Sequence, residues 1–129
     1  MRGQWVRRAT FALASVVLLG GAVAAHHSQP GFSPNTKPID LKGTVAEYRW
    51  RNPHVLFFFD VKDDKGTAVR WVGEFGSVPS SIARGMTKDT FKVGEEVTVN
   101  GVPATAGTPA IQLRRIVKAD GTVIGGATE

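Results

Sequence analysis

Three histidines are the residues in this sequence best suited to bind a ligand. His26 and His27 are adjacent, and His54 follows an Asn-Pro pair. Neutral imidazole nitrogens bind copper, nickel and zinc, and they are the commonest metal ligands in proteins. The chain has no cysteine, and its methionines are Met1 and Met86 alone, so a soft Cu(I) site is disfavoured. We therefore predict that His26, His27 and His54 form a site for Cu(II) or another divalent metal.

The ligand set depends on the first residue of the working chain, because a free amine is itself a nitrogen ligand. If the chain begins at Ala25, its amine, two backbone amides and the His27 imidazole can form a square-planar set suited to Cu(II) or Ni(II). If it begins at His26, its amine and imidazole can chelate one ion in a geometry that resembles a histidine brace, and His27 or His54 can add a nitrogen. In either case the amine, with an ordinary pKa of about 7.7–8.0, must lose its proton, so affinity falls as pH falls.

These two starting residues follow from an export signal in the first 25 residues. Three arginines and no acidic residue precede residues 9–25, which carry no charge and end in small residues, as in a secretory signal peptide. This uncharged stretch is shorter than the ~20 residues of a membrane-spanning helix. We therefore predict export by the general secretory route with cleavage after Ala24 or Ala25. The product is periplasmic or secreted and keeps no stable membrane anchor.

Charge and motif content disfavour several other functions. The formal net charge is +5, but removal of the three signal arginines leaves 13 basic against 11 acidic residues, which is too small an excess for binding along a nucleic-acid backbone. The sequence has no Gly-x-Ser-x-Gly motif, phosphate-binding loop, dinucleotide fingerprint or cysteine nucleophile. We interpret Glu47 and Glu74 as solvated charges on strands. The sequence thus predicts a binding protein and no catalytic site.

The mature chain, of about 104 residues, is long enough for one core. Residues 26–38 contain three prolines and no apolar period, which predicts an irregular arm before a barrel domain over 39–125 and a tail over 126–129. Residues 55–61 carry apolar side chains on both faces, so we expect that strand to be covered on both sides. The expected strands span 41–50, 55–61, 68–75, 95–102, 111–117 and 122–124, with a short helix over 77–85.

This element order predicts an all-β fold with one short helix. Three strands, a helix, two strands and a terminal hairpin piece match a small five- to six-stranded Greek-key barrel that resembles the oligonucleotide/oligosaccharide-binding fold. A β-sandwich normally uses more strands and is the less economical choice. Such barrels often bind ligands through aromatic side chains near their loops, so Trp50 and Asn52 are candidate ligand-binding residues. The alternative to a metal protein is therefore a metal-free module that binds a glycan, peptide or protein partner of the cell envelope.

Several short motifs give the sequence a resemblance to a known family. They are His26-His27-Ser28, Gly43-Thr44-Val45, Trp50-Arg51-Asn52-Pro53-His54, Trp71-Val72-Gly73-Glu74 and the strand over 93–99. Together they resemble a family of small exported bacterial proteins classed as a domain of unknown function, over nearly the whole mature chain. The resemblance implies that the terminal histidines and the Asn-Pro-His turn occur as a set, which favours one shared site.

Overall fold

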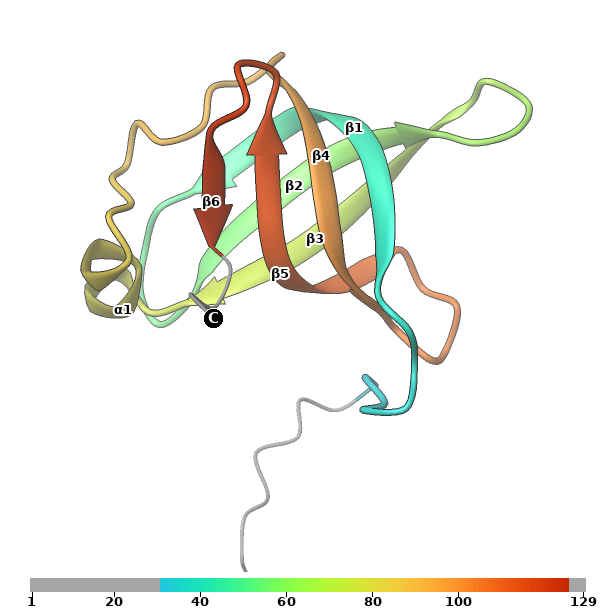
Figure 1. The fold of residues 1–129 in the computed structure, drawn as a ribbon, viewed down its shortest axis with the longest axis horizontal. Coiled ribbons are helices and arrows are strands. Elements are labelled where there is room, and N and C mark those ends of the chain that lie inside the picture. Colours follow the sequence, from blue (N-terminus) through green and yellow to red (C-terminus); the bar gives the residue numbers. More distant parts are fainter. Residues whose placement is uncertain (1–30, 126–129) are drawn as a thin grey trace, which may run out of the picture.

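The structure, a computed structural model, describes residues 31–125. The predicted signal peptide, the predicted tail and two predicted metal ligands, His26 and His27, lie outside the described residues. Within residues 31–125 the chain forms strands and one short helix (Figure 1). The elements are β1 (Ile39–Arg49), β2 (Val55–Lys62), β3 (Ala68–Gly76), α1 (Val78–Ala83), β4 (Glu96–Pro103), β5 (Ala110–Lys118) and β6 (Val123–Gly125). Every predicted element is present, and its ends differ from the prediction by at most two residues.

The strands form one sheet that closes on itself. Its order is β3-β2-β1-β4-β5-β6, and neighbours in this order are antiparallel. The sheet closes because β3 also pairs with β5 in parallel, with Val72 opposite Ala110 and Gly73 opposite Ile111. Strand β6 lies beside β5 outside the closed ring. This arrangement confirms the predicted small Greek-key barrel of the oligonucleotide/oligosaccharide-binding type, with the helix between its third and fourth strands.

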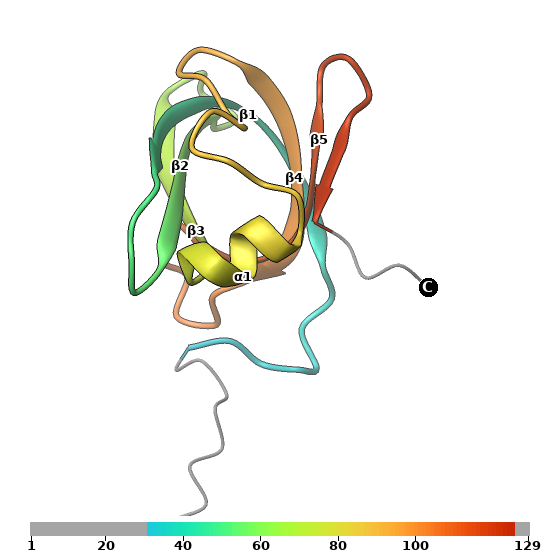
Figure 2. The same ribbon diagram turned by 90° about the vertical axis from the view of Figure 1, so that its left-hand side faces the viewer.

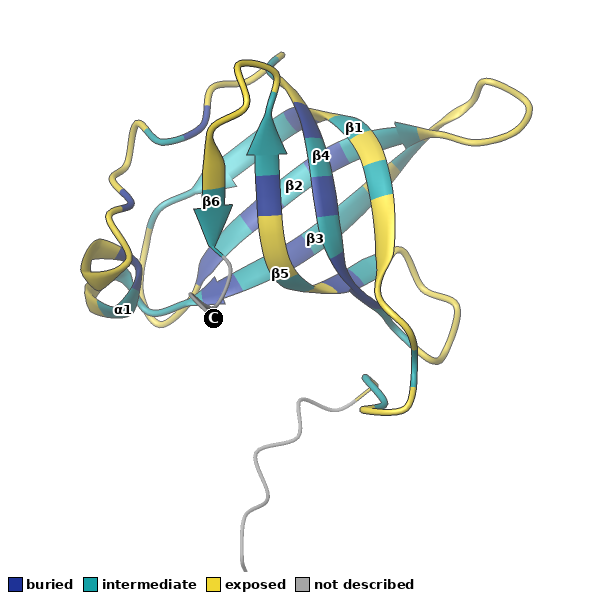
Figure 3. Ribbon diagram, in the orientation of Figure 1, coloured by how far each residue is buried: buried dark blue, intermediate teal, exposed yellow. Residues whose placement is uncertain are grey.

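The core follows from the alternation of apolar residues along the strands. On β2, Val55, Phe57 and Phe59 have no exposed surface, and the residues between them are half-buried (Figure 3). Phe91 enters the core from the segment before β4, and its ring centroid lies 4.8 Å from that of Phe57. Figure 2 shows α1 and the following segment lying across one end of the barrel, where Met86 is 2% exposed. The core is thus filled by the inward faces of the strands and by residues from the segment after α1.

Two strand glycines allow neighbouring backbones to approach closely. A Cβ atom at Gly43 on β1 would lie 2.6 Å from the carbonyl oxygen of Asp60 on β2. A Cβ atom at Gly101 on β4 would collide with the carbonyl oxygen of Gln112 on β5, where the register of the two strands shifts. Both obstacles are backbone atoms, which cannot rotate away. The close approach of β1 to β2 and of β4 to β5 therefore requires glycine at positions 43 and 101.

The expectation that β2 is covered on both sides holds only in part. On its outer face Leu56 and Phe58 are only half-buried, and Val72 lies opposite Phe58 on β3. The guanidinium carbon of Arg49 lies 4.9 Å from the centre of the Phe58 ring and covers part of it. A strip of half-buried apolar side chains, which we call the outer strip, therefore remains on this side. It consists of Leu56, Phe58 and Val72.

Candidate functional site

The turn between β1 and β2 is fixed to the start of the helix. The side-chain oxygen of Asn52 accepts a hydrogen bond of 2.9 Å from the backbone N–H of Val78, the first residue of α1. Ser77 caps the helix, its hydroxyl accepting from the backbone N–H of Ser80 at 3.3 Å. The peptide bond between Asn52 and Pro53 is cis. His54, which follows directly, is thus carried by a turn that is attached at both ends to ordered structure.

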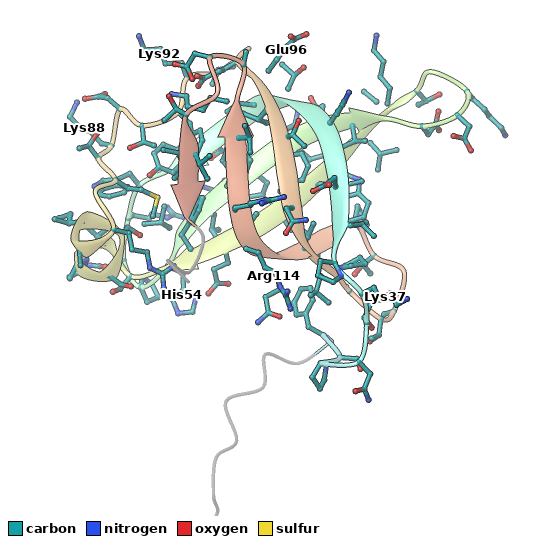
Figure 4. The ribbon with its side chains drawn as sticks, viewed as in Figure 1. Lys37, His54, Lys88, Lys92, Glu96 and Arg114 are labelled. Carbon is teal, nitrogen blue, oxygen red and sulfur yellow. The ribbon has the colours of Figure 1, made fainter. Side chains whose placement is uncertain are left out.

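His54 contacts a carboxylate on the neighbouring strand. Its Nδ1 atom pairs with Glu74, because the register of β2 and β3 places Glu74 opposite Leu56. The His54 side chain is 53% exposed and that of Glu74 is 31% exposed. When Nδ1–H donates to the carboxylate, the other ring nitrogen of a neutral imidazole, Nε2, carries the lone pair and can accept a hydrogen bond or bind a metal. Figure 4 shows His54 at the barrel surface, on the same side of the molecule as α1.

The two predicted ligand-binding residues, Trp50 and Asn52, make contacts that stabilise the fold. The amide of Asn52 holds the start of α1, and Trp50 is half-buried against the core, 5.8 Å from the Tyr48 ring. Tyr48 in turn meets the edge of Phe91 at 5.2 Å and donates a hydrogen bond of 3.2 Å to the carbonyl of Thr87. Burial raises the pKa of Tyr48 to about 12. Trp50 therefore belongs to an aromatic cluster that closes this end of the barrel.

A small cavity lies beside the His54–Glu74 pair. Its volume is about 130 Å³, and it is lined by Phe32, Leu56, Val72, Gly73, Glu74, Ala110 and Ile111. Phe32 comes from the arm that precedes β1, whereas the other residues belong to β2, β3 and β5. The arm is held there because the carbonyl of Gly31 accepts hydrogen bonds from Thr105, at 2.8 Å from its backbone N–H and 3.1 Å from its hydroxyl. Glu74 thus borders both His54 and the place where the described part of the arm begins.

A larger groove, of about 560 Å³, lies over β1, β2, β4 and β5 and contains none of the predicted site residues. Two of the charged residues that line it, Asp60 and Lys118, form ion pairs. Lys118 pairs with Glu95 at 2.9 Å, and Arg70 holds the pKa of Asp60 below its ordinary value by hydrogen bonding to the carboxylate.

Two absences complete the description of residues 31–125. Nowhere in this part of the chain do three or more histidine, aspartate and glutamate side chains gather as a metal site. The helix found in this range is too short and too polar to cross a membrane. His54 and Glu74 are the pair of such residues that the structure brings together at the predicted site.

Glu74 is the site residue that sequence reasoning missed. The signal that predicts it is the hairpin register: when β2 begins just after His54 and β3 ends at Gly76, residues 74–76 must lie beside the start of β2. His54 is placed at a turn next to a carboxylate, while the positions of His26 and His27 lie outside the described residues.

Fold and site together define a small, closed β-barrel with a histidine–carboxylate pair at the edge of its β2–β3 face. The chain belongs to a family of unknown function, DUF6152, whose family model matches residues 12–112. This confirms the resemblance to a domain of unknown function that the motifs indicated. No curated protein and no solved structure matches the chain.

Proposed function

We propose that this protein is exported, loses residues 1–25, and binds Cu(II) or another divalent metal through His26, His27 and His54. The observation that carries the proposal is the contact between His54 Nδ1 and Glu74. Histidines that bind metals almost always donate their second ring N–H to a carboxylate, a carbonyl or water, which fixes the ring and makes it a better ligand. His54 has this arrangement and is half exposed.

The length and entry point of the arm support a contribution from the terminal histidines. Phe32 lines the same cavity as Glu74, and His27 precedes Phe32 by five residues. An extended chain advances about 3.3–3.6 Å per residue, so His27 reaches up to roughly 17 Å from Phe32. His26 and the amine of the cleaved chain reach slightly further. The described part of the arm therefore begins close to Glu74, which also contacts His54.

The donor set favours a metal of intermediate softness. Imidazole and amine nitrogens suit Cu(II), Ni(II) and Zn(II), whereas calcium and magnesium prefer oxygen ligands. The sequence offers no cysteine thiolate. Copper(II) is the first choice because it binds nitrogen ligands most tightly among these divalent ions.

The test starts from the protein recovered from the envelope fraction of an expressing bacterium. Intact mass identifies its first residue, and titration with Cu(II), Ni(II) and Zn(II) gives the affinities. We expect His27→Ala and His54→Ala each to weaken Cu(II) binding, while Lys92→Ala, a change at an exposed loop residue, leaves it unchanged. Affinity in the wild type no higher than in a variant lacking all three histidines contradicts the proposal.

A second candidate function rests on the outer strip. Barrels of this type bind oligonucleotides and oligosaccharides on the face of their second and third strands, and that face carries the half-buried Leu56, Phe58 and Val72. This favours the metal-free alternative, a module for a glycan, peptide or protein partner of the envelope. Capture from envelope extracts by the wild type in the presence of a chelator, lost in Phe58→Ser, supports it; capture of the same molecules by both variants contradicts it.

A further inference from the structure

We propose that the groove over β1, β2, β4 and β5 binds an acidic saccharide, a short sugar chain that carries carboxylates as well as hydroxyl groups. The groove, of about 560 Å³, lies within the size range of small-molecule sites, roughly 300–1,000 Å³. Neither His54 nor the outer strip lines it. The proposal therefore goes beyond the proposed function, and it requires neither a metal nor export of the protein.

The floor of the groove is the outer face of paired strands. Figure 1 shows β1, β4 and β5 side by side, and Figure 2 shows that α1 lies across one end of the barrel and leaves this face open. Strand pairing places Lys42 opposite Thr98, and Thr44 opposite both Asp60 and Glu96. Side chains directly opposite on neighbouring strands begin about 4.5–5.5 Å apart. The polar groups of the groove therefore form one compact patch.

Two lysines of this patch have no carboxylate to neutralise them. Lys42 and Lys62 are exposed and line the groove from neighbouring strands, and neither takes part in the ion pairs of residues 31–125. Like charges held close together on neighbouring strands destabilise a sheet. An anion between the two ammonium groups removes this repulsion and accepts charge-assisted hydrogen bonds from both. The groove is thus suited to a carboxylate.

The other polar groups favour a ligand that also carries hydroxyls. Thr44 and Thr98 present hydroxyls, each of which can donate and accept a hydrogen bond. Glu96 adds an exposed carboxylate, which accepts hydrogen bonds from hydroxyls but repels a dense polyanion. A sugar acid meets both demands, since its carboxylate pairs with the lysines and its hydroxyls donate to Glu96.

The backbone of the groove favours a saccharide over an acidic peptide. Extended peptides commonly bind by adding a strand to the exposed edge of a sheet. Here β1 is hydrogen-bonded to β4, and β4 to β5, so the floor offers side chains instead of a free edge. The half-buried Val117, opposite Thr98, provides an apolar surface against which the C–H face of a sugar ring can pack.

The experiment is an NMR titration of the protein, as recovered from an expressing bacterium, with tri-galacturonate in the presence of a chelator. We expect amide shifts to change at 42–44, 60–62, 97–98 and 117–119, and to stay constant in α1. Lys42→Gln and Lys62→Gln should each weaken binding about two- to fivefold, as for an exposed charge pair. Lys37→Gln is the matched control: it neutralises an exposed lysine outside the groove, at the opposite end of the view from Glu96 (Figure 4).

Two further probes separate the recognition of a sugar acid from simple charge attraction. The methyl ester of tri-galacturonate keeps the sugar rings without the charges, and capped tri-glutamate keeps the carboxylates without the sugar hydroxyls. Both should bind more weakly than tri-galacturonate. Equal binding of either probe overturns the proposal, as does the absence of shift changes in the groove or an equal loss of affinity in Lys37→Gln.

One variant distinguishes this site from the outer strip. Phe58→Ser removes the ring of the outer strip and should leave the affinity for tri-galacturonate unchanged, because Phe58 does not line the groove. Loss of binding in Phe58→Ser, with none in the Lys42 and Lys62 variants, places the ligand on the outer strip and overturns the proposal. Because metal is removed, neither result bears on the Cu(II) titration, and failure of that titration leaves the groove site intact.

Discussion

Replacement of Glu74 by glutamine is the sharpest test of how His54 is used. Glutamine keeps the size of the side chain and can still accept a hydrogen bond from Nδ1, but it removes the negative charge beside the imidazole. If His54 binds a metal through Nε2, that charge makes the ring a stronger donor. Glu74→Gln should therefore weaken Cu(II) binding without unfolding the protein, since Glu74 is 31% exposed and outside the core.

The expected size of the effect follows from the exposure of the pair. Changes to residues that orient metal ligands typically lower affinity about 10- to 100-fold. The His54 side chain is 53% exposed, so water screens the pair and the effect should lie at the lower end. We expect about a tenfold loss, equivalent to ~1.4 kcal/mol of binding free energy.

Calorimetric titration with Cu(II) measures this loss, and electron paramagnetic resonance reports the nitrogens on the metal. Glu96→Gln is the matched control: it makes the same change at an exposed residue of β4, and Figure 4 shows Glu96 far from His54. The reasoning is refuted if His54→Ala weakens binding and alters the spectrum while Glu74→Gln leaves both affinity and spectrum unchanged. In that case His54 acts without help from the carboxylate.

The remaining predictions concern the barrel. Gly43→Ala should lower the free energy of unfolding by about 1–3 kcal/mol in urea melts, because its Cβ meets the backbone of Asp60; an unchanged midpoint would show that β1 and β2 separate freely. Phe57→Ala should cost about 3–5 kcal/mol in the same melts, since the ring is fully buried, and a smaller loss would mean that the core collapses into the space. Because burial raises the pKa of Tyr48 from 10.0 to about 12, the stability that it contributes is complete below pH 10 and is lost as pH rises from 10 to 12. Tyr48→Phe should flatten this alkaline loss in urea melts taken at increasing pH, and an identical slope in both proteins would contradict the assignment.

The fold was predictable because local sequence signals agree with the final topology. Alternation in β2 identifies Phe57 and Phe59 as core residues, and both are fully buried. The loss of proline's donor at Asn52-Pro53 and the turn at Asp63–Gly66 separate the strands as observed. The predicted ends of the strands were less exact than their existence. A strand ends where its pairing with the neighbouring strand ends, and this depends on both segments.

Cover on the outer face of β2 was not predictable from alternation. Apolar side chains at Leu56 and Phe58 show that a surface avoids water, but they do not identify what lies on it. The structure supplies Arg49 over Phe58 and the arm's Phe32 beside Leu56. Both contacts come from other segments of the chain, so the alternation of residues within β2 does not predict them.

The candidate site was predictable in part. His54 stood out as a histidine at a turn, and Asn52 as its neighbour, but their partners come from other elements. Glu74 reaches His54 through cross-strand register, and Asn52 is used by the first backbone N–H of α1. The type of a residue indicates whether its side chain can bind a ligand, whereas the pairing of strands determines which of these side chains lie in contact.

The parallel pairing of β3 with β5 also determines which part of the barrel can form last during synthesis. A growing chain emerges N-terminus first, so the β2–β3 hairpin appears long before Ala110 and Ile111, which close the ring against it. Thr105, which holds the arm at Gly31, appears equally late. Until then the ring lacks the strand that closes it against β3, and, if the protein is exported as we propose, the chain is still open enough to pass through a translocation pore. We expect chains truncated before residue 110 to stay protease-sensitive, and addition of β5 to produce resistance in a single step.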